Sequence, residues 1–127
     1  MKPKFGEIWM CNLLERSGSV QSGIRPVFIL SNNLNNVHSP TVNVIPITSR
    51  VSKKKLPIHV PLANYSEYGL IKPSTILVEQ ITTVPVDYLS VRLGEIADNE
   101  TLNQLFRAIE IQFPIVAMFA NKSAKAA

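Results

Sequence analysis

The chain has 127 residues, of which 46% are hydrophobic, and a formal net charge of +4. This length and apolar content fit one domain with a single core, which we place at residues 1–120, with a disordered tail at 121–127. The single cysteine excludes an intramolecular disulfide, and the two histidines are not spaced as metal ligands, so we predict no metal site and no cofactor.

The amino-terminal segment reads as the start of a soluble domain. The apolar run after Lys2 and Lys4 is broken by Glu7 and Asn12, which excludes a signal peptide and a membrane span. We therefore expect a cytoplasmic protein with no membrane partner. Cys11 lies in this apolar run and is expected to be a buried small side chain rather than a nucleophile.

Strand-length apolar and β-branched stretches dominate the chain. They span residues 5–14, 24–31, 41–49, 56–62, 74–84 and 91–96. Most are joined by short connections, and one convincing helix follows them. The pattern predicts a mainly β fold, in which a small, strongly bent antiparallel barrel carries a C-terminal helix.

The helical signals are concentrated in the last third of the chain. Residues 85–89 fit a single helical turn, and a longer helix is expected to begin after Asp98 or Asn99, either of which can cap it. Its apolar stripe consists of Leu102, Leu105, Phe106, Ile109 and Phe113. Pro114 predicts a kink, followed by more helix through Phe119. The apolar run 114–120 should pack on the barrel or on a second subunit, and we favour a dimer contact.

Two neighbouring strands place an arginine and a threonine in register. If the turn-rich stretch between strands 24–31 and 41–49 is symmetrical about Asn36 and Val37, facing residues have numbers that sum to 73. Arg25 and Thr48 satisfy that sum. The hairpin therefore predicts that these two side chains are cross-strand partners, close enough to act on one ligand group.

The same segments resemble the MazF/PemK toxins of bacterial toxin–antitoxin pairs. The resemblance covers about residues 5–119 and rests on the motifs GEIW at 6–9, GSVQSGIRPV at 18–27, SPT at 39–41, PIT at 46–48, KLPIHV at 55–60 and ILVEQITT at 76–83. It implies an SH3-like barrel, a homodimer and a cognate MazE-like antitoxin. It also implies metal-independent cleavage of single-stranded RNA at a short sequence, with 2′,3′-cyclic phosphate and 5′-hydroxyl ends.

By the same resemblance, the catalytic residues are Arg25 and Thr48. Residues that match RNA contacts of the family are Ser19, Gln21, Asn32, Leu56, Pro57, Ser74, Glu79 and Gln80. Beside Thr48 we add Lys53, Lys54 and Lys55 as a basic rim that attracts phosphates. The sequence departs from the family at Val20, where a glutamate is common, so a mechanism that uses that glutamate as a base is not expected here.

Some of the candidate site residues can also be explained by a role in the fold alone. Arg25 can be a surface arginine paired with Glu7 or Glu79, and His59 fits a hydrogen-bonded structural residue better than an acid or base. Glu79 and Gln80 interrupt an apolar run, and in a strand they would point to opposite faces. We expect Gln80 to read a base edge, because an amide both donates and accepts hydrogen bonds.

Three functions remain open from the sequence. The first is a sequence-specific endoribonuclease toxin, which the pair Arg25 and Thr48 favours. The second is a CcdB-like gyrase-binding toxin without nuclease activity, which has no need of such a pair. The third is a non-catalytic RNA-binding domain, for which Val20 is the hint.

Overall fold

The computed structural model of this chain describes residues 2–50 and 55–118. Two of the predicted basic residues, Lys53 and Lys54, lie outside the described residues, as does the predicted tail at 121–127. None of the helices in the described part is long and apolar enough to cross a bilayer.

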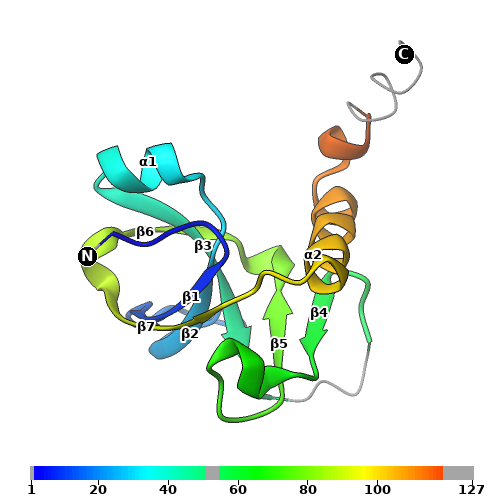
Figure 1. The fold of residues 1–127 in the computed structure, drawn as a ribbon, viewed down its shortest axis with the longest axis horizontal. Helices are drawn as coiled ribbons and strands as arrows, with labels where there is room; N and C mark the ends of the chain where they lie inside the picture. Colours follow the sequence, from blue (N-terminus) through cyan, green and yellow to red (C-terminus); the bar gives the residue numbers. More distant parts are fainter. Residues whose placement is uncertain (1, 51–54, 119–127) are drawn as a thin grey trace.

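Seven antiparallel strands form one strongly curved sheet (Figure 1). The strands are β1 (Glu7–Asn12), β2 (Ile24–Ile29), β3 (Thr41–Thr48), β4 (His59–Leu62), β5 (Ser74–Leu77), β6 (Thr82–Pro85) and β7 (Leu89–Glu95). The helical elements are α1 (Asn33–His38), α2 (Asn99–Gln112) and the 3-10 turns η1 (Tyr65–Tyr68), η2 (Val78–Gln80) and η3 (Val86–Tyr88). The prediction of a mainly β fold with a C-terminal helix is confirmed, and so is the helical turn near residues 85–89.

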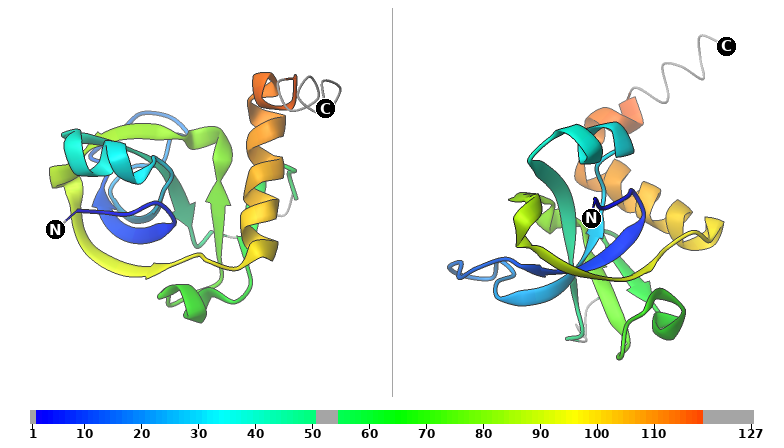
Figure 2. Two further views of the ribbon diagram at one scale, coloured as in Figure 1. Left: turned by 45° about the horizontal axis from the view of Figure 1, so that its top comes forward. Right: turned by 60° about the vertical axis from the view of Figure 1, so that its left-hand side comes forward.

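The sheet curls without closing into a barrel. Its order is β4-β5-β3-β2-β1-β7, with β6 as a further neighbour of β3, and among the described residues β4 and β7 do not pair. β3 is shared by two arms, because residues 41–44 pair with β6 and residues 47–48 pair with β5 (Figure 2). The predicted small, strongly bent antiparallel barrel with a C-terminal helix is therefore found in an open form, as a bent sheet whose two outer strands, within the described part of the chain, are unpaired with each other.

Two apolar clusters fill the bend. One, around Ile8, Phe28 and Ile45, is covered by α2, and the other, around Trp9 and Cys11, lies inside the curl. Cys11 is fully buried, and burial raises the pKa of its thiol to about 11. The thiol is therefore protonated at neutral pH, and the prediction that Cys11 is a buried small side chain is confirmed.

Polar side chains explain two elements that differ from the sequence prediction. The stretch taken as a hairpin turn is the helix α1, which Asn32 caps by accepting the backbone N–H of Asn35 at 2.8 Å. Asn36 is fully buried and exchanges two hydrogen bonds with Ser31, so this asparagine-rich segment satisfies its own polar groups as a helix. The single strand predicted at 74–84 is divided by η2 into β5 and β6.

The long helix α2 begins where its cap predicts. Asp98 accepts the backbone N–H of Thr101 at 3.0 Å, and Leu105 is buried. α2 ends at Gln112, and residues 114–118 are again helical, so the interruption at Pro114 is as predicted. Of the predicted apolar stripe, Phe106 stays 50% exposed, so the stripe is wider than the surface that this chain covers.

Candidate active site

The predicted register between β2 and β3 is confirmed, but the pairing ends before the two candidate residues. The paired residues are Val27 with Pro46, Phe28 with Ile45 and Ile29 with Val44, and each pair sums to 73. Two residues further along, Arg25 lies opposite Cys11 of β1, while Thr48 lies opposite Thr75 of β5.

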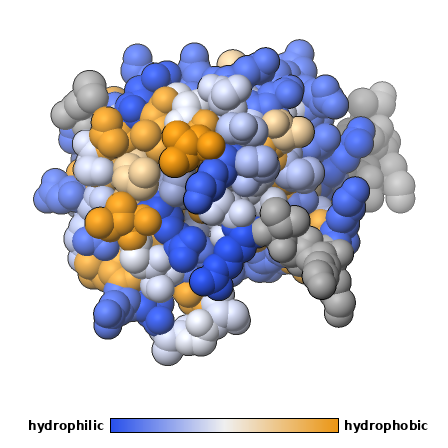
Figure 3. All heavy atoms as spheres, turned by 90° about the horizontal axis from the view of Figure 1, so that it is seen from below, coloured by the Kyte–Doolittle hydropathy of each residue, from blue (hydrophilic) through white to orange (hydrophobic). Residues whose placement is uncertain are grey.

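The direct cross-strand pair of the prediction is thus corrected to two positions at the same end of neighbouring strands, just past their last paired residues. Proline explains the change, since Pro26 and Pro46 lack the N–H groups that a continued ladder would use. Figure 3 views the end of the molecule at which β3 finishes, where hydrophobic groups are interspersed with hydrophilic ones.

Thr48 is held by the sheet. Its side chain belongs to the buried polar residues, with 6% exposure, and its Oγ1 accepts the backbone N–H of Arg50 at 3.2 Å. Oγ1 thus accepts one hydrogen bond, and among the described residues its hydroxyl proton has no acceptor, so it can donate to a ligand. Thr48 therefore presents a donor whose position is fixed by its strand.

Arg25 is held by the loop that precedes β2. Its Nε donates to the carbonyl oxygen of Ser22 at 2.7 Å, and among the described residues its terminal nitrogens have no hydrogen-bond partner. The alternative pairing with an acid does not occur, because Glu7 bonds Arg92 and Glu79 bonds His59. The terminal edge of the half-buried guanidinium is thus left for a ligand.

The loop between β1 and β2 is closed at its base and docked onto η2. Two backbone bonds join Leu13 and Leu14 to Gly23, at 2.9 and 2.8 Å. Farther along, the side chain of Gln80 accepts the backbone N–H of Gln21 at 2.7 Å and donates to the carbonyl of Ser19 at 3.2 Å. The structure therefore brings Ser19, Gln21 and Gln80 together.

The expectation that Glu79 and Gln80 lie on opposite faces of a strand is wrong, because both belong to the 3-10 turn η2. Glu79 Oε2 lies 2.6 Å from Nε2 of His59, so the prediction of a hydrogen-bonded His59 is confirmed. Glu79 Oε1 and Gln21 Oε1 are buried without a hydrogen-bond partner among the described residues. Two acceptors beside the docked loop are thus left open to a donor.

The other predicted contacts are spread over both ends of the sheet. Lys55, Leu56 and Pro57 are exposed just before β4, and Ser74 begins the neighbouring strand β5, where its hydroxyl donates to the carbonyl of Lys72. Asn32 is not brought to this group, because it caps α1 at the opposite end of β3 (Figure 1).

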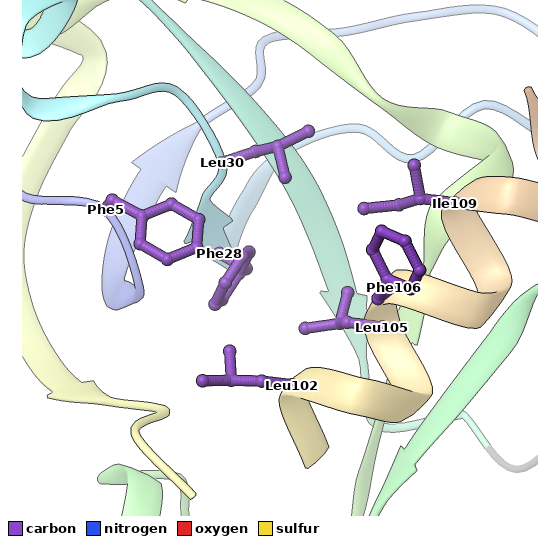
Figure 4. Close-up of a pocket in the computed structure, with 7 residues that line it drawn as sticks. All are labelled: Phe5, Phe28, Leu30, Leu102, Leu105, Phe106 and Ile109. Atoms are coloured by element: carbon purple, nitrogen blue, oxygen red, sulfur yellow. The ribbon is translucent and has the colours of Figure 1, made fainter. Parts of the chain in front are cut away.

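Two features of the site were missed by sequence reasoning, and so was a third feature that none of the predicted site residues lines. The first is Arg16, whose guanidinium donates to the carbonyl of Leu13 at 3.1 Å and to Oγ1 of Thr82 at 3.5 Å. The second is the Ser22 carbonyl, which accepts a hydrogen bond from Arg25. A backbone acceptor leaves no sequence signal. The third feature is an apolar pocket of about 230 Å³ between α2 and the start of the chain (Figure 4). It is lined by Phe5, Phe28, Leu30, Leu102, Leu105, Phe106 and Ile109.

Comparison with known proteins points to one family. A family model described as "PemK-like, MazF-like toxin of type II toxin-antitoxin system" matches residues 4–113. Endoribonuclease MazF of Staphylococcus saprophyticus is 37% identical over 118 residues, which are 93% of this chain and 97% of that protein. Endoribonuclease EndoA of Bacillus subtilis is 34% identical over 113 residues, which are 89% of this chain and 96% of that protein.

Solved structures agree with the sequence relatives. The Mycobacterium tuberculosis toxin MazF-mt6 superposes with a TM-score of 0.70 at 27% identity, covering 85% of this chain and 96% of that one. A mycobacterial endoribonuclease in complex with its cognate antitoxin gives a TM-score of 0.69 at 26% identity, covering 88% of this chain and 95% of that one.

Proposed function

Because the chain belongs to the family of PemK-like, MazF-like toxins of type II toxin–antitoxin systems, we propose that it cleaves single-stranded RNA at a short specific sequence through Arg25 and Thr48. In the proposed reaction a ribose 2′-oxygen attacks the adjacent phosphorus, the bond to the 5′-oxygen breaks, and the products carry 2′,3′-cyclic phosphate and 5′-hydroxyl ends. The observation that carries the proposal is that the terminal N–H groups of Arg25 and the hydroxyl of Thr48 lie at one end of β2 and β3 and have no acceptor among the described residues.

Arg25 suits the charge that this reaction develops. Attack by the 2′-oxygen builds negative charge on the non-bridging oxygens, and stabilising it needs donors that are already aimed at those oxygens. With its Nε fixed by the Ser22 carbonyl, the guanidinium presents its terminal N–H groups as a fork. Each charge-assisted hydrogen bond from that fork contributes about 1.5–3 kcal/mol.

Thr48 supplies a second, neutral donor. Since the backbone N–H of Arg50 occupies an acceptor position of Oγ1, the hydroxyl proton is free to point at a phosphate oxygen or to orient the 2′-hydroxyl. A buried hydroxyl in a strand moves little between the free and bound protein, so its donor is preorganised.

Proton transfer in the proposed reaction does not need a carboxylate base. A guanidinium is a poor base at neutral pH, and the loop carries Val20, whose side chain is 47% exposed and has no titratable group. The 2′-hydroxyl proton passes to water or to a phosphate oxygen, and the departing 5′-oxygen takes up a proton from water or from that phosphate oxygen to become the 5′-hydroxyl, while Arg25 donates a hydrogen bond that stabilises it as it leaves. The residues proposed to contact the RNA around the site are Ser19, Gln21, Lys53, Lys54, Lys55, Leu56, Pro57, Ser74 and Glu79, together with Gln80 through the loop that it holds. Asn32 is proposed only for an RNA that extends past α1.

Two protein partners belong to the proposal. A cognate MazE-like antitoxin is supported by the mycobacterial relative, whose structure is that of a complex with its antitoxin. A homodimer is supported by the apolar side chains that α2 and the segment after it leave exposed, such as Phe106 at 50%, Ile111 at 53% and Ile115 at 74%. Size measurement in solution tests the dimer, and a monomer at micromolar concentration would contradict it.

The activity is tested with a mixed RNA pool in the presence of a chelator. Cleavage at a recurrent sequence with cyclic phosphate ends supports the proposal, and the Arg25→Ala variant is the matched control for a contaminating nuclease. Gyrase inhibition without cleavage would favour the CcdB-like alternative, which the curated relatives, both named endoribonucleases, do not favour. RNA binding without cleavage would favour a non-catalytic domain.

A further inference from the structure

The side-chain amide of Gln80 makes two hydrogen bonds to the loop between β1 and β2, one through its oxygen and one through its nitrogen. Its Oε1 accepts the backbone N–H of Gln21 at 2.7 Å, and its Nε2 donates to the carbonyl of Ser19 at 3.2 Å. One side chain thus fixes two backbone groups that are two residues apart. Among side chains of this size and shape, glutamine alone offers both groups at neutral pH, because an ionised glutamate has no donor and methionine has no N–H or O–H group.

The fixed backbone leads directly to Arg25. Ser22 is the residue after Gln21, and its carbonyl accepts the Arg25 Nε proton at 2.7 Å. The Gln21 N–H that Gln80 holds lies two peptide units before the Ser22 carbonyl, so this hydrogen bond restricts the loop segment that leads into the group orienting the guanidinium. The Ser22–Gly23 peptide is also held at the base of the loop, where the Gly23 N–H donates to the Leu14 carbonyl at 2.8 Å. Beyond that base Ser19 and Val20 are exposed, and among the described residues the other side-chain tie of the loop to the sheet is the long contact of Arg16 with Thr82 at 3.5 Å.

The other side of this contact is rigid. Gln80 ends η2, whose first residue, Val78, is fully buried and donates its N–H to the Ile58 carbonyl at 3.1 Å. Glu79 is joined to His59 of β4 at 2.6 Å. Because η2 is fixed by these contacts, the Gln80 side chain can fix the loop, which itself has few buried side chains.

We infer that Gln80 is a positioning residue, which aligns Arg25 for the reaction by clamping Ser19 and Gln21, rather than a reader of a base edge. The inference rests on the proposed function, since it presupposes that Arg25 acts on a phosphate. A displacement of about 1 Å at a reacting group costs up to about 100-fold in rate, so a loosened loop lowers the catalytic rate even when RNA binding is kept.

The test uses the full-length Gln80→Met variant, which keeps the side-chain length and removes both hydrogen bonds. Cleavage of an RNA with one cut site is measured under steady-state conditions, with Gln104→Met on the exposed surface of α2 as the control. We expect kcat to fall about 10- to 100-fold with KM within about twofold and the cut sites unchanged. We also expect the Gln21 amide to exchange with deuterium about tenfold faster, with no change in the control.

A second variant, Gln80→Glu, separates the two bonds. It keeps an acceptor for the Gln21 N–H but has no donor for the Ser19 carbonyl, so its Gln21 exchange should stay closer to that of the wild type than in Gln80→Met. A kcat equal to that of the wild type in Gln80→Met overturns the inference. So does a changed cut sequence with kcat retained, which is the result that base reading predicts. If the wild-type protein cuts no RNA, the proposed function fails instead, and the exchange of Gln21 still decides whether Gln80 holds the loop.

Discussion

Arg25 and Thr48 lie at the same end of two neighbouring strands, yet different parts of the molecule hold them. Thr48 is nearly buried in β3, which is paired on both edges, and its position follows from the core. Arg25 begins β2, and its guanidinium is oriented by a carbonyl of the preceding loop. One donor of the site is therefore as rigid as the sheet, and the other is only as rigid as a loop held by Gln80 and by the backbone bonds at its base.

The largest effect is expected at the residue held by the loop. Arg25→Ala should lower cleavage by about 10³-fold or more, because it removes the guanidinium that the proposed mechanism uses to stabilise the developing phosphate charge. The change should cost little stability, since the half-buried side chain makes one hydrogen bond to a carbonyl, worth about 1 kcal/mol. Single-turnover cleavage and thermal melting measure the two effects. Cleavage near the wild-type rate would remove Arg25 from the site.

The residue held by the sheet should show a smaller effect. Thr48→Val keeps the shape of the side chain and removes one preorganised donor, a loss that costs about 10²-fold in comparable sites. Thr48→Ser keeps the hydroxyl and should retain most of the rate, so the pair of variants separates the donor from the packing. Equal rates for Thr48→Val and the wild type would show that the hydroxyl does not take part.

A third variant shifts the comparison from the catalytic donors to the basic rim. Replacing Lys53, Lys54 and Lys55 with alanine should weaken RNA binding and reduce the slope of log K against log salt by about 2, if all three contact phosphates. Fluorescence titration at several salt concentrations measures the slope. The triple change Lys2→Ala, Lys4→Ala and Arg107→Ala, at three exposed positions, is the control for net charge. An unchanged slope would place the RNA elsewhere.

The smallest effect on activity is expected far from both donors, at the start of α2. Hydrogen bonds from Thr101 and Tyr68 hold the pKa of Asp98 at about 2, below its ordinary value of 3.8. A lowered pKa means that this carboxylate contributes stability above pH 3.8, and that the contribution is lost as the pH falls toward 2. Asp98→Ala should lower the free energy of unfolding at pH 7 by about 1 kcal/mol, with cleavage unchanged. Chemical denaturation at pH 7 and at pH 2.5 checks this, since the difference between the two proteins should shrink in acid.

The parts of the fold that depend on residue pattern were predictable from the sequence, and the parts that depend on single contacts were not. The β2–β3 register, the Asp98 cap and the interruption at Pro114 all followed from periodicity, capping chemistry and a missing N–H. The helix α1 did not follow from the sequence. Its asparagine-rich composition indicates a turn, and the helix depends on the buried hydrogen bonds between Asn36 and Ser31.

For the site, the sequence located Arg25 and Thr48 but not what orients them. The Ser22 carbonyl is a backbone atom, and any residue at position 22 would supply it. Gln80 was singled out from its amide, and its two bonds to the loop depend on η2, a turn that the strand prediction excluded. The exposed apolar residues of α2 were visible in the pattern, which cannot tell a core from an interface.

The joint action of Arg25 and Thr48 on one phosphodiester is tested most directly by a double-mutant cycle. The rates of chemical cleavage of a single-site RNA are compared for the wild type, Arg25→Lys, Thr48→Val and the double variant, since lysine keeps the charge and leaves a measurable rate. If both side chains hold the same phosphate, the double variant loses clearly less than the product of the two single losses. A double variant whose loss equals that product would mean that the two residues act independently, and would contradict a shared site.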